Sequence, residues 1–89
     1  MPSTIHKFSM TAEQSEFQIP ADATVLHVGH QHGVTCLWIQ LDLEAPAVTR
    51  RFRIYATGQL ITEPNDKLTY LGSVQTPAGF VWHLFVVLS

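Results

Sequence analysis

The stretch Thr24-Val-Leu-His-Val-Gly-His-Gln-His-Gly-Val-Thr-Cys-Leu-Trp-Ile-Gln-Leu-Asp-Leu43 contains two runs of β-branched and apolar residues on either side of His32-Gly33. Glycine readily takes the positive φ that a tight hairpin turn requires. Neither run has the three- to four-residue spacing of an amphipathic helix. The stretch therefore predicts an antiparallel hairpin formed by residues 24–31 and 34–43.

The segments before this hairpin carry a weaker form of the same pattern. Residues 4–10 are short, mixed and rich in β-formers, and residues 15–19 alternate polar and apolar side chains. They predict two opening strands, and a hairpin is the simplest arrangement for them. Proline removes a ladder donor, so Pro20 and the three residues after it predict a turn.

After the hairpin, a loop at Glu44–Ala47 leads into a cleanly alternating run, residues 48–57. Successive side chains of a strand point to opposite faces. One face of this run carries Val48, Phe52, Ile54 and Ala56, and the other carries Thr49, Arg51, Arg53, Tyr55 and Thr57. Arg50 shares the apolar face, which places it near a sheet edge or beside a partner.

Two further strands complete the chain. Residues 68–75 follow a turn signal at Glu63–Asp66, and a second turn at Thr76–Gly79 leads into Phe80–Leu88. That last run is apolar on both faces apart from His83, as expected of a strand covered on both sides. It predicts a strand that is either central in a sandwich or buried in a subunit interface.

No segment combines helical periodicity with a capping signal, so about six to seven short strands are expected. Turn-separated strands of this kind are typical of a small antiparallel β-sandwich or open barrel. At 89 residues the chain has room for one core, and 46% hydrophobic against 13% charged residues favours a packed globule. The sequence therefore predicts a single all-β domain over residues 1–89.

Composition also limits the function classes. A net charge of −2 with scattered acidic residues gives no field that would attract a polyanion, so general nucleic-acid binding is not expected. The single cysteine, Cys36, excludes an internal disulfide and a cysteine-based zinc site. The sequence has no signal peptide pattern and no apolar run approaching the roughly 20 residues of a membrane span. A cytoplasmic protein without membrane contact is expected.

The histidines suggest a metal site, because His27, His30 and His32 lie close together in the sequence and imidazole binds zinc, copper and nickel. In an extended strand, however, His27 and His30 point to opposite faces. No recognised ligand spacing is present, so no metal and no cofactor are expected. A metal-dependent hydrolase that uses these three histidines, with His6 or His83 added by the fold, is the alternative.

The main candidate site is the polar face of residues 48–57. Arg51, Arg53 and Tyr55, with Trp38 from a neighbouring strand that also carries Gln40 and Asp42, would combine forked donors with a stacking surface. Such a surface suits a phosphate, a carboxylate or an acidic partner. The competing interpretation is structural: the arginines pair with acidic residues and stiffen a polar face. The acidic residues available for this are Asp42, Glu44 and Glu63.

Catalytic signatures are missing from the sequence. A catalytic nucleophile needs an adjacent base and an oxyanion site. Its position in a sequence is usually marked by a glycine-flanked turn motif, and no such motif occurs in this chain. Cys36 lies beside Leu37 and Trp38, which predicts a small buried hydrophobe in place of a reactive thiol. The sequence therefore predicts a protein that is not an enzyme.

Motifs along nearly the whole chain resemble a family of small proteins of tailed bacteriophages and prophages. They are Ile5–Phe8, Leu26–Gly29, Gln31, Gly33, Leu37-Trp38, Asp42, Arg50–Arg53, Thr57-Gly58, Tyr70–Gly72 and Phe80–Phe85. Related sequences tend to have Gly-Thr-Gly where this chain has Ala56-Thr57-Gly58, and often have a proline near Val34-Thr35. These departures leave the turn at residues 32–33 intact.

The resemblance implies an accessory protein that acts in the cytoplasm of an infected bacterium. Such a protein would bind a host protein, or sequester an anionic small molecule such as a signalling nucleotide used in immunity, and so serve host takeover or anti-defence. A homo-oligomer with Phe80–Leu88 at or near the interface is expected. A minor virion or assembly component is a further alternative.

Overall fold

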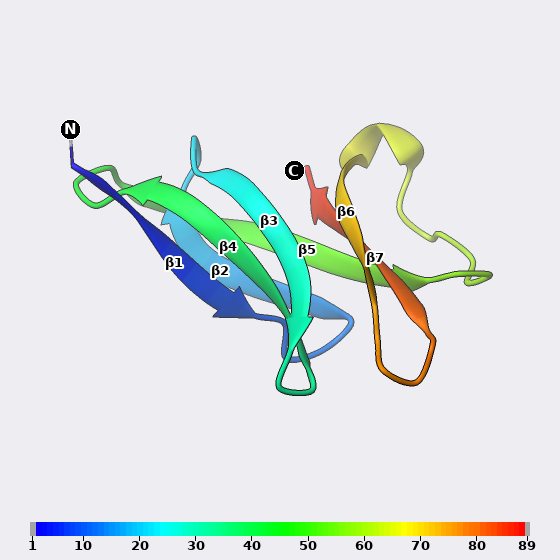
Figure 1. The fold of residues 1–89 in the computed structure, drawn as a ribbon. Coiled ribbons are helices and arrows are strands. Elements are labelled where there is room, and N and C mark those ends of the chain that lie inside the picture. Colours follow the sequence, from blue (N-terminus) through cyan, green and yellow to red (C-terminus); the bar gives the residue numbers. More distant parts are fainter. Residues whose placement is uncertain (1, 89) are drawn as a thin grey trace.

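Seven strands account for most of residues 2–88, the part of the chain that the computed structural model describes (Figure 1). They are β1 (Ser3–Ser9), β2 (Gln14–Pro20), β3 (Thr24–Gln31), β4 (Val34–Asp42), β5 (Ala47–Ala56), β6 (Leu68–Gln75) and β7 (Val81–Val87). A three-residue 3₁₀ turn, η1 (Asn65–Lys67), precedes β6. The prediction of an all-β fold is confirmed.

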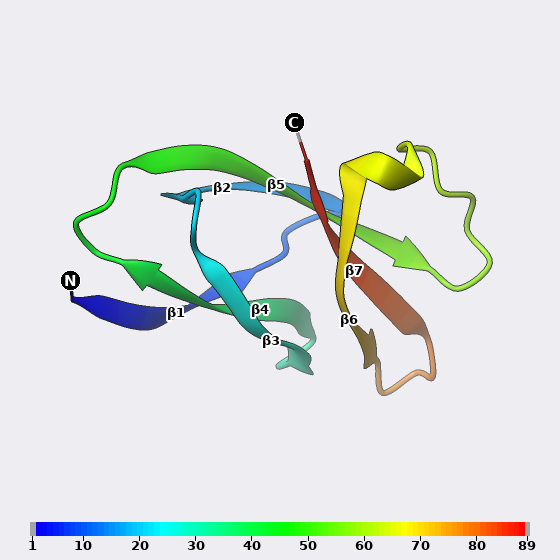
Figure 2. The ribbon, with the colours of Figure 1, turned by 90° about the horizontal axis from the view of Figure 1, so that it is seen from above.

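The strands form two antiparallel sheets. Sheet A has the order β1-β4-β3, and sheet B has the order β2-β5-β7-β6. Seen from above in Figure 2, β1 and β4 lie in one layer and β2 and β5 in the other, with β7 and β6 extending sheet B to one side. The fold is a small β-sandwich.

The first two strands do not form the expected hairpin. β1 pairs with β4 in sheet A, and β2 pairs with β5 in sheet B. The connection between them crosses from one layer to the other: the Met10 N–H donates to the Thr35 carbonyl, and the Glu13 carbonyl accepts from the Ile54 N–H. Met10 fills the space between the layers and is buried, so the apolar residue at this crossing belongs to the core.

The predicted hairpin at residues 24–43 is confirmed as β3 and β4. Its turn residues both have positive φ, 53° at His32 and 80° at Gly33. Two consecutive positive φ values characterise the hairpin turn whose twist matches that of the flanking strands. β4 is the central strand of sheet A, paired with β1 on one side and with β3 on the other.

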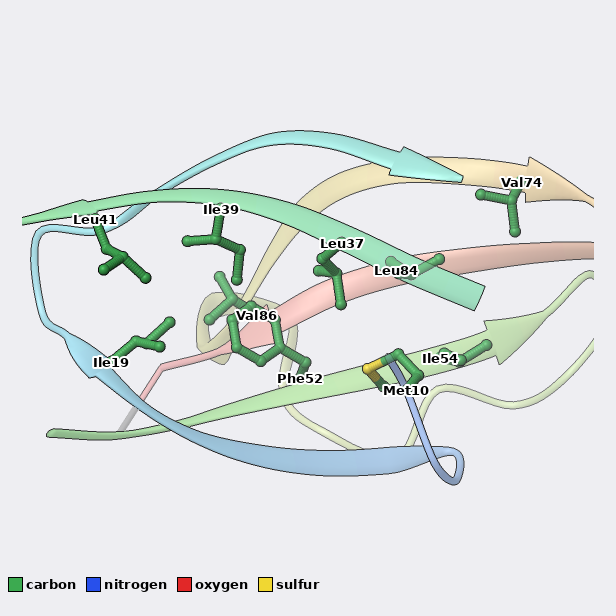
Figure 3. Packing of buried hydrophobic residues seen from close by; sticks show 10 residues of the cluster. All are labelled: Met10, Ile19, Leu37, Ile39, Leu41, Phe52, Ile54, Val74, Leu84 and Val86. Carbon is green, nitrogen blue, oxygen red and sulfur yellow. The ribbon is translucent and has the colours of Figure 1, made fainter. Parts of the chain in front are cut away.

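The core lies between the sheets, where alternate side chains of each strand meet (Figure 3). Its buried members are Met10, Ile19, Leu37, Ile39, Leu41, Phe52, Ile54, Val74, Leu84 and Val86. Because Leu37, Ile39 and Leu41 point inward from β4, the side chains between them point to the outer face of sheet A. The same alternation sends Arg51, Arg53 and Tyr55 to the outer face of sheet B.

The last strand, β7, is internal to sheet B, since β5 and β6 pair with its two edges. A central place in the sandwich is thus confirmed for Val81–Val87, whereas the subunit interface stays a prediction. Arg50, placed by its sequence on the apolar face, donates from its guanidinium to the carbonyls of Ala21 and Ala23. It secures the turn between β2 and β3.

Sheets A and B approach each other most closely where the edges of β3 and β6 meet. β6 has a register shift between Tyr70 and Gly72, and β3 has one between Val25 and His27. A Cβ at Gly72 would lie 2.6 Å from Cγ2 of Val28, and φ at Gly72 is 155°. Glycine is therefore required there both by its backbone conformation and by the close contact.

Candidate functional site

The predicted site residues separate onto two surfaces. Arg51, Arg53 and Tyr55 lie on β5 in sheet B, whereas Trp38 lies on β4 in sheet A. Strands that follow each other in the chain need not pair. β5 pairs with β2 and β7, and not with β4, which precedes it in the chain. The expectation that Trp38, Gln40 and Asp42 flank the arginines is wrong.

Trp38 belongs to a separate surface on the outer side of sheet A. Its ring packs against that of His27, with centroids 5.4 Å apart. A Cβ at Gly29 would be 3.3 Å from the Trp38 ring, which shows that the indole lies over this glycine. Trp38 is therefore held by its own sheet and does not contribute to the arginine site.

Around the arginines, β7 and β6 supply the neighbours that Trp38 does not. The register places Phe85 beside Arg53, and Tyr70 beside Phe85. Phe85 packs against Tyr70 with ring centroids 5.5 Å apart and against Tyr55 at 5.9 Å. We call this surface the arginine–aromatic face. It consists of Arg51, Arg53, Tyr55, Tyr70, Ser73, His83 and Phe85.

The Arg53 guanidinium lies over the Tyr55 ring, with Cζ 4.7 Å from the ring centroid. A cation over an aromatic face is attracted by the ring quadrupole, by about 0.5–2 kcal/mol depending on solvation. The Nε atom of Arg53 is buried and has no hydrogen-bond partner in residues 2–88. Stacking thus positions the guanidinium, while the buried Nε–H stays without a partner among these residues.

Tyr55 is not the exposed stacking ring that the alternation of β5 predicts. Its side chain is only 2% exposed, because the loop between β5 and β6 passes over it. The Tyr55 hydroxyl donates to the Glu63 carboxylate and contacts Thr62 Oγ1 at 3.3 Å. The ring available for stacking with a ligand is Tyr70, which is 58% exposed.

Glu63 is the acidic residue that this arrangement affects most. Hydrogen bonding from Tyr55, then from Thr62, and the positive charge of Arg53 lower the pKa of the Glu63 carboxyl, against the opposing effect of burial. Its hydrogen bonds go to the hydroxyl groups of Tyr55 and Thr62. Of the three acidic partners considered for the arginines, Glu63 is the one whose charge acts on Arg53.

The other two acidic residues lie elsewhere. Asp42 is on β4, and its Oδ1 accepts from the backbone N–H of Glu44. On the β2 side, Glu16 lies directly opposite Arg51 in the strand register. The arginine–aromatic face thus has acidic side chains at its margins and two half-buried arginines between them.

A chain of hydroxyl groups and an imidazole extends the arginine–aromatic face across β7. The Nδ1 atom of His83 is 2.7 Å from Ser73 Oγ, and its Nε2 atom is 2.8 Å from Thr57 Oγ1. Tyr70 Oη lies 2.6 Å from the same Ser73 hydroxyl. A neutral imidazole donates from one nitrogen and accepts at the other, so each hydroxyl can take either role.

Sequence reasoning missed Tyr70, Ser73, His83 and Phe85 as members of one surface. The alternation of Phe80–Leu88 already places His83 and Phe85 on a common face. Tyr70 and Ser73, three residues apart, share a face because the register shift in β6 changes the alternation. A single sequence gives no signal for such a bulge beyond the glycine at position 72.

The clustered histidines do not come together. His27 packs on Trp38, the His30 Nδ1 atom is 3.3 Å from Thr35 Oγ1, and His32 is in the β3–β4 turn. In residues 2–88, no group of three or more histidine, cysteine or carboxylate side chains is placed to hold a metal ion. The same residues include no helix long and apolar enough to cross a membrane.

A cavity of about 610 Å³ opens at the β3–β4 end of the sandwich. Met10, Ile54 and Trp82 form its apolar walls, and Glu13 and His30 are among its polar lining residues. None of the four predicted site residues lines it. Cys36 is 2% exposed, so its prediction as a buried residue is confirmed.

The fold and this surface define a small two-sheet β-sandwich whose larger sheet carries arginines, aromatic rings and hydroxyl groups on its outer face. The chain belongs to the family described as Domain of unknown function (DUF7352), whose family model matches residues 1–89. No curated protein matches the chain, and no solved structure matches it.

Proposed function

We propose that this protein is a non-enzymatic binding protein that holds an anionic ligand with a flat ring system, of the nucleotide class, on the arginine–aromatic face. The observation that carries the proposal is the register that sets Arg53 opposite Phe85 and Phe85 opposite the exposed ring of Tyr70, with Arg51 two residues along β5 on the same face.

Each part of this surface has a chemical counterpart in a nucleotide. Guanidinium groups bind phosphate oxygens through paired, charge-assisted hydrogen bonds. Stacking of a base on an aromatic side chain contributes about 1–3 kcal/mol. The hydroxyl groups of Ser73 and Thr57, ordered by His83, offer donors and acceptors to the sugar or base edge.

The organisation of the arginine–aromatic face favours binding in place of a purely structural role. Arg53 is already fixed on the Tyr55 ring, so less side-chain entropy is lost when it meets an anion. The hydrogen bonds of the Glu63 carboxylate go to the hydroxyl groups of Tyr55 and Thr62 and not to the Arg53 guanidinium. An acidic segment of a host protein is the other occupant of matching charge.

The biological setting proposed for this activity follows from the sequence resemblance to phage and prophage proteins. In that setting the protein acts in the host bacterial cytoplasm as an accessory factor in host takeover or anti-defence. Sequestering a signalling nucleotide and blocking a host protein are both compatible with a binding surface of this kind. We also propose that the protein is a homo-oligomer.

Calorimetric titration with a panel of adenine and guanine nucleotides tests the proposal. Inorganic phosphate and adenosine, each of which carries one part of the ligand, are titrated separately. Each charge-assisted hydrogen bond is worth about 1.5–3 kcal/mol, so Arg51→Ala combined with Arg53→Ala lowers affinity by roughly 100-fold or more. Tyr70→Ala weakens binding, whereas Tyr70→Phe retains stacking.

Arg50→Ala is the control for charge, because Arg50 lies on the other face of β5 and binds the backbone of the β2–β3 turn. Its nucleotide affinity stays within a few-fold of wild type. Nucleotide binding that survives loss of both Arg51 and Arg53 overturns the proposal, as does the absence of binding by every nucleotide tested. Binding of an acidic peptide alone would identify the occupant as a protein.

A further inference from the structure

The free edge of β1 carries an inference about assembly that deepens the homo-oligomer part of the proposed function and rests on it. A sheet edge exposes unpaired backbone groups that template pairing with another strand. The sandwich has four such edges in residues 2–88: β1 and β3 in sheet A, and β2 and β6 in sheet B.

Three of these edges are blocked or interrupted. β3 and β6 each have a register shift, and they contact each other where Val28 meets Gly72. β2 ends in Pro20, which has no N–H to donate. Bulges, prolines and exposed charged side chains, lysine above all, are the usual devices that prevent strand pairing at an edge. β1, at the border of sheet A in Figure 1, has no bulge and no proline within Ser3–Ser9. Its one lysine, Lys7, donates from Nζ to Gln31 Oε1 on β3 at 3.0 Å, on the far side of β4 from the free edge.

The hydrogen bonds at the two ends of β1 reveal which of its backbone groups are free. The Met10 N–H donates to the Thr35 carbonyl, and the Leu43 N–H donates to the Pro2 carbonyl, both in the register of the β1–β4 pair. In an antiparallel pair, alternate residues direct their N–H and C=O groups to the partner. The even-numbered residues of β1 therefore face β4, and Ser3, Ile5, Lys7 and Ser9 present their backbone groups to the free edge.

These four residues are self-complementary about a two-fold axis at His6. Antiparallel pairing with a second copy would set Ser3 opposite Ser9 and Ile5 opposite Lys7, each as a hydrogen-bonded pair. The one charged side chain, Lys7, then meets an apolar side chain and not its own copy. Ile5, which is 54% exposed, would lie directly opposite Lys7 of the second copy, at the cross-strand spacing at which side chains make contact.

We infer that a second copy of this chain docks on the free edge of β1, pairing Ile5 with Lys7 across a two-fold axis so that the two A sheets become one six-stranded sheet. The surface assigned to ligand lies on sheet B and stays open in this dimer. Each dimer accordingly carries two arginine–aromatic faces.

Sedimentation equilibrium of the untagged full chain tests this inference over roughly 1–200 µM protein, the range in which a modest interface dissociates. The wild type is expected as a dimer of 10.0 kDa chains. Ile5→Pro removes an N–H that faces the free edge and not β4, so it yields a monomer. Glu16→Pro is the matched control, because Glu16 occupies the equivalent outward position on the β2 edge, and it leaves the dimer intact.

A charge pair at position 5 tests the register without proline. Opposite charges directly across an antiparallel pair attract and like charges repel. Ile5→Glu would face the partner's Lys7 and Ile5→Lys would oppose it. Two such pairs form per dimer, so the dissociation constants of the two variants differ by roughly 10-fold, with the lysine variant weaker.

The outcomes separate this inference from the proposal on which it rests. A wild type that is monomeric over the whole range overturns both the homo-oligomer and the β1 edge. If the wild type is an oligomer and Ile5→Pro, Ile5→Glu and Ile5→Lys do not change its dissociation constant, the homo-oligomer stands but its interface is not the β1 edge. Two results together support an interface at the β1 edge. Ile5→Pro is a monomer with the β-sheet circular dichroism of the wild type, and Ile5→Lys dimerises more weakly than Ile5→Glu.

Discussion

Tyr55→Phe should weaken the protein in a way that depends on pH. The substitution removes the hydroxyl that donates to the Glu63 carboxylate and that lies 3.4 Å from the backbone nitrogens of Thr62 and Glu63. A hydrogen bond to a charged group contributes about 1.5–3 kcal/mol, so we expect unfolding at pH 7 to require about that much less free energy.

The pH dependence follows from the lowered pKa of Glu63. A carboxyl whose pKa is lower in the folded state stabilises the protein above its unfolded-state pKa, and this stabilisation is lost as pH falls through the folded-state pKa. At pH 7 the Glu63 carboxylate contributes fully, and its contribution declines as pH falls below the unfolded-state pKa toward the lowered folded-state pKa. The cost of Tyr55→Phe should accordingly fall in acid, toward about 1 kcal/mol or less once the Glu63 carboxyl is protonated and only neutral hydrogen bonds remain.

Urea unfolding followed by tryptophan fluorescence at pH 7 and pH 3 measures both quantities. Tyr70→Phe is the matched control, since the Tyr70 hydroxyl bonds to Ser73 and not to a carboxylate. We expect it to cost about 1 kcal/mol or less at either pH. An equal cost of Tyr55→Phe at the two pH values, or no cost at pH 7, would refute the role assigned to Glu63.

The remaining predictions concern the fold. Gly72→Ala should lower the free energy of unfolding by about 1–3 kcal/mol through the contact with Val28, and adding Val28→Ala should recover part of this loss. Gly79 also has a positive φ but has open space around it, so comparing Gly79→Ala with Gly72→Ala in thermal melts separates the effect of the contact from that of the backbone. His32→Asn should stabilise the β3–β4 turn by up to about 1 kcal/mol, because asparagine tolerates positive φ better than histidine; an unchanged melting temperature would contradict this. Cys36 should react with a thiol reagent only at the rate of unfolding, since it is 2% exposed, and rapid labelling of the native protein would count against its burial.

Alternation within single strands was a reliable guide to which side chains face the core. It placed Phe52 and Ile54 inward and Arg51 and Arg53 outward, and the structure agrees. The turn at His32-Gly33 could also be predicted from the sequence, because few residue types accept two positive φ values in succession. These features depend on local backbone geometry, which the sequence encodes directly.

The pairing of strands could not be predicted from the sequence in the same way. The β1–β2, β2–β3 and β4–β5 connections all cross between the sheets, so only the β3–β4 and β6–β7 pairs are neighbours both in sequence and in a sheet. Alternation predicts the face on which a side chain lies but not the partner strand, so the sequence alone wrongly predicts Trp38 beside Arg51 and Arg53. Tyr55 was placed outward correctly, yet the loop that covers it depends on a tertiary contact with Glu63.

Native mass spectrometry of the untagged protein purified from a bacterial lysate is the most direct test of ligand binding on sheet B. We predict a nucleotide-sized adduct on the wild type and on Arg50→Ala, and none on Arg51→Ala combined with Arg53→Ala. An adduct that persists in the double variant, or a bare wild-type mass that stays bare after incubation with the nucleotide panel, would contradict nucleotide binding at the arginine–aromatic face.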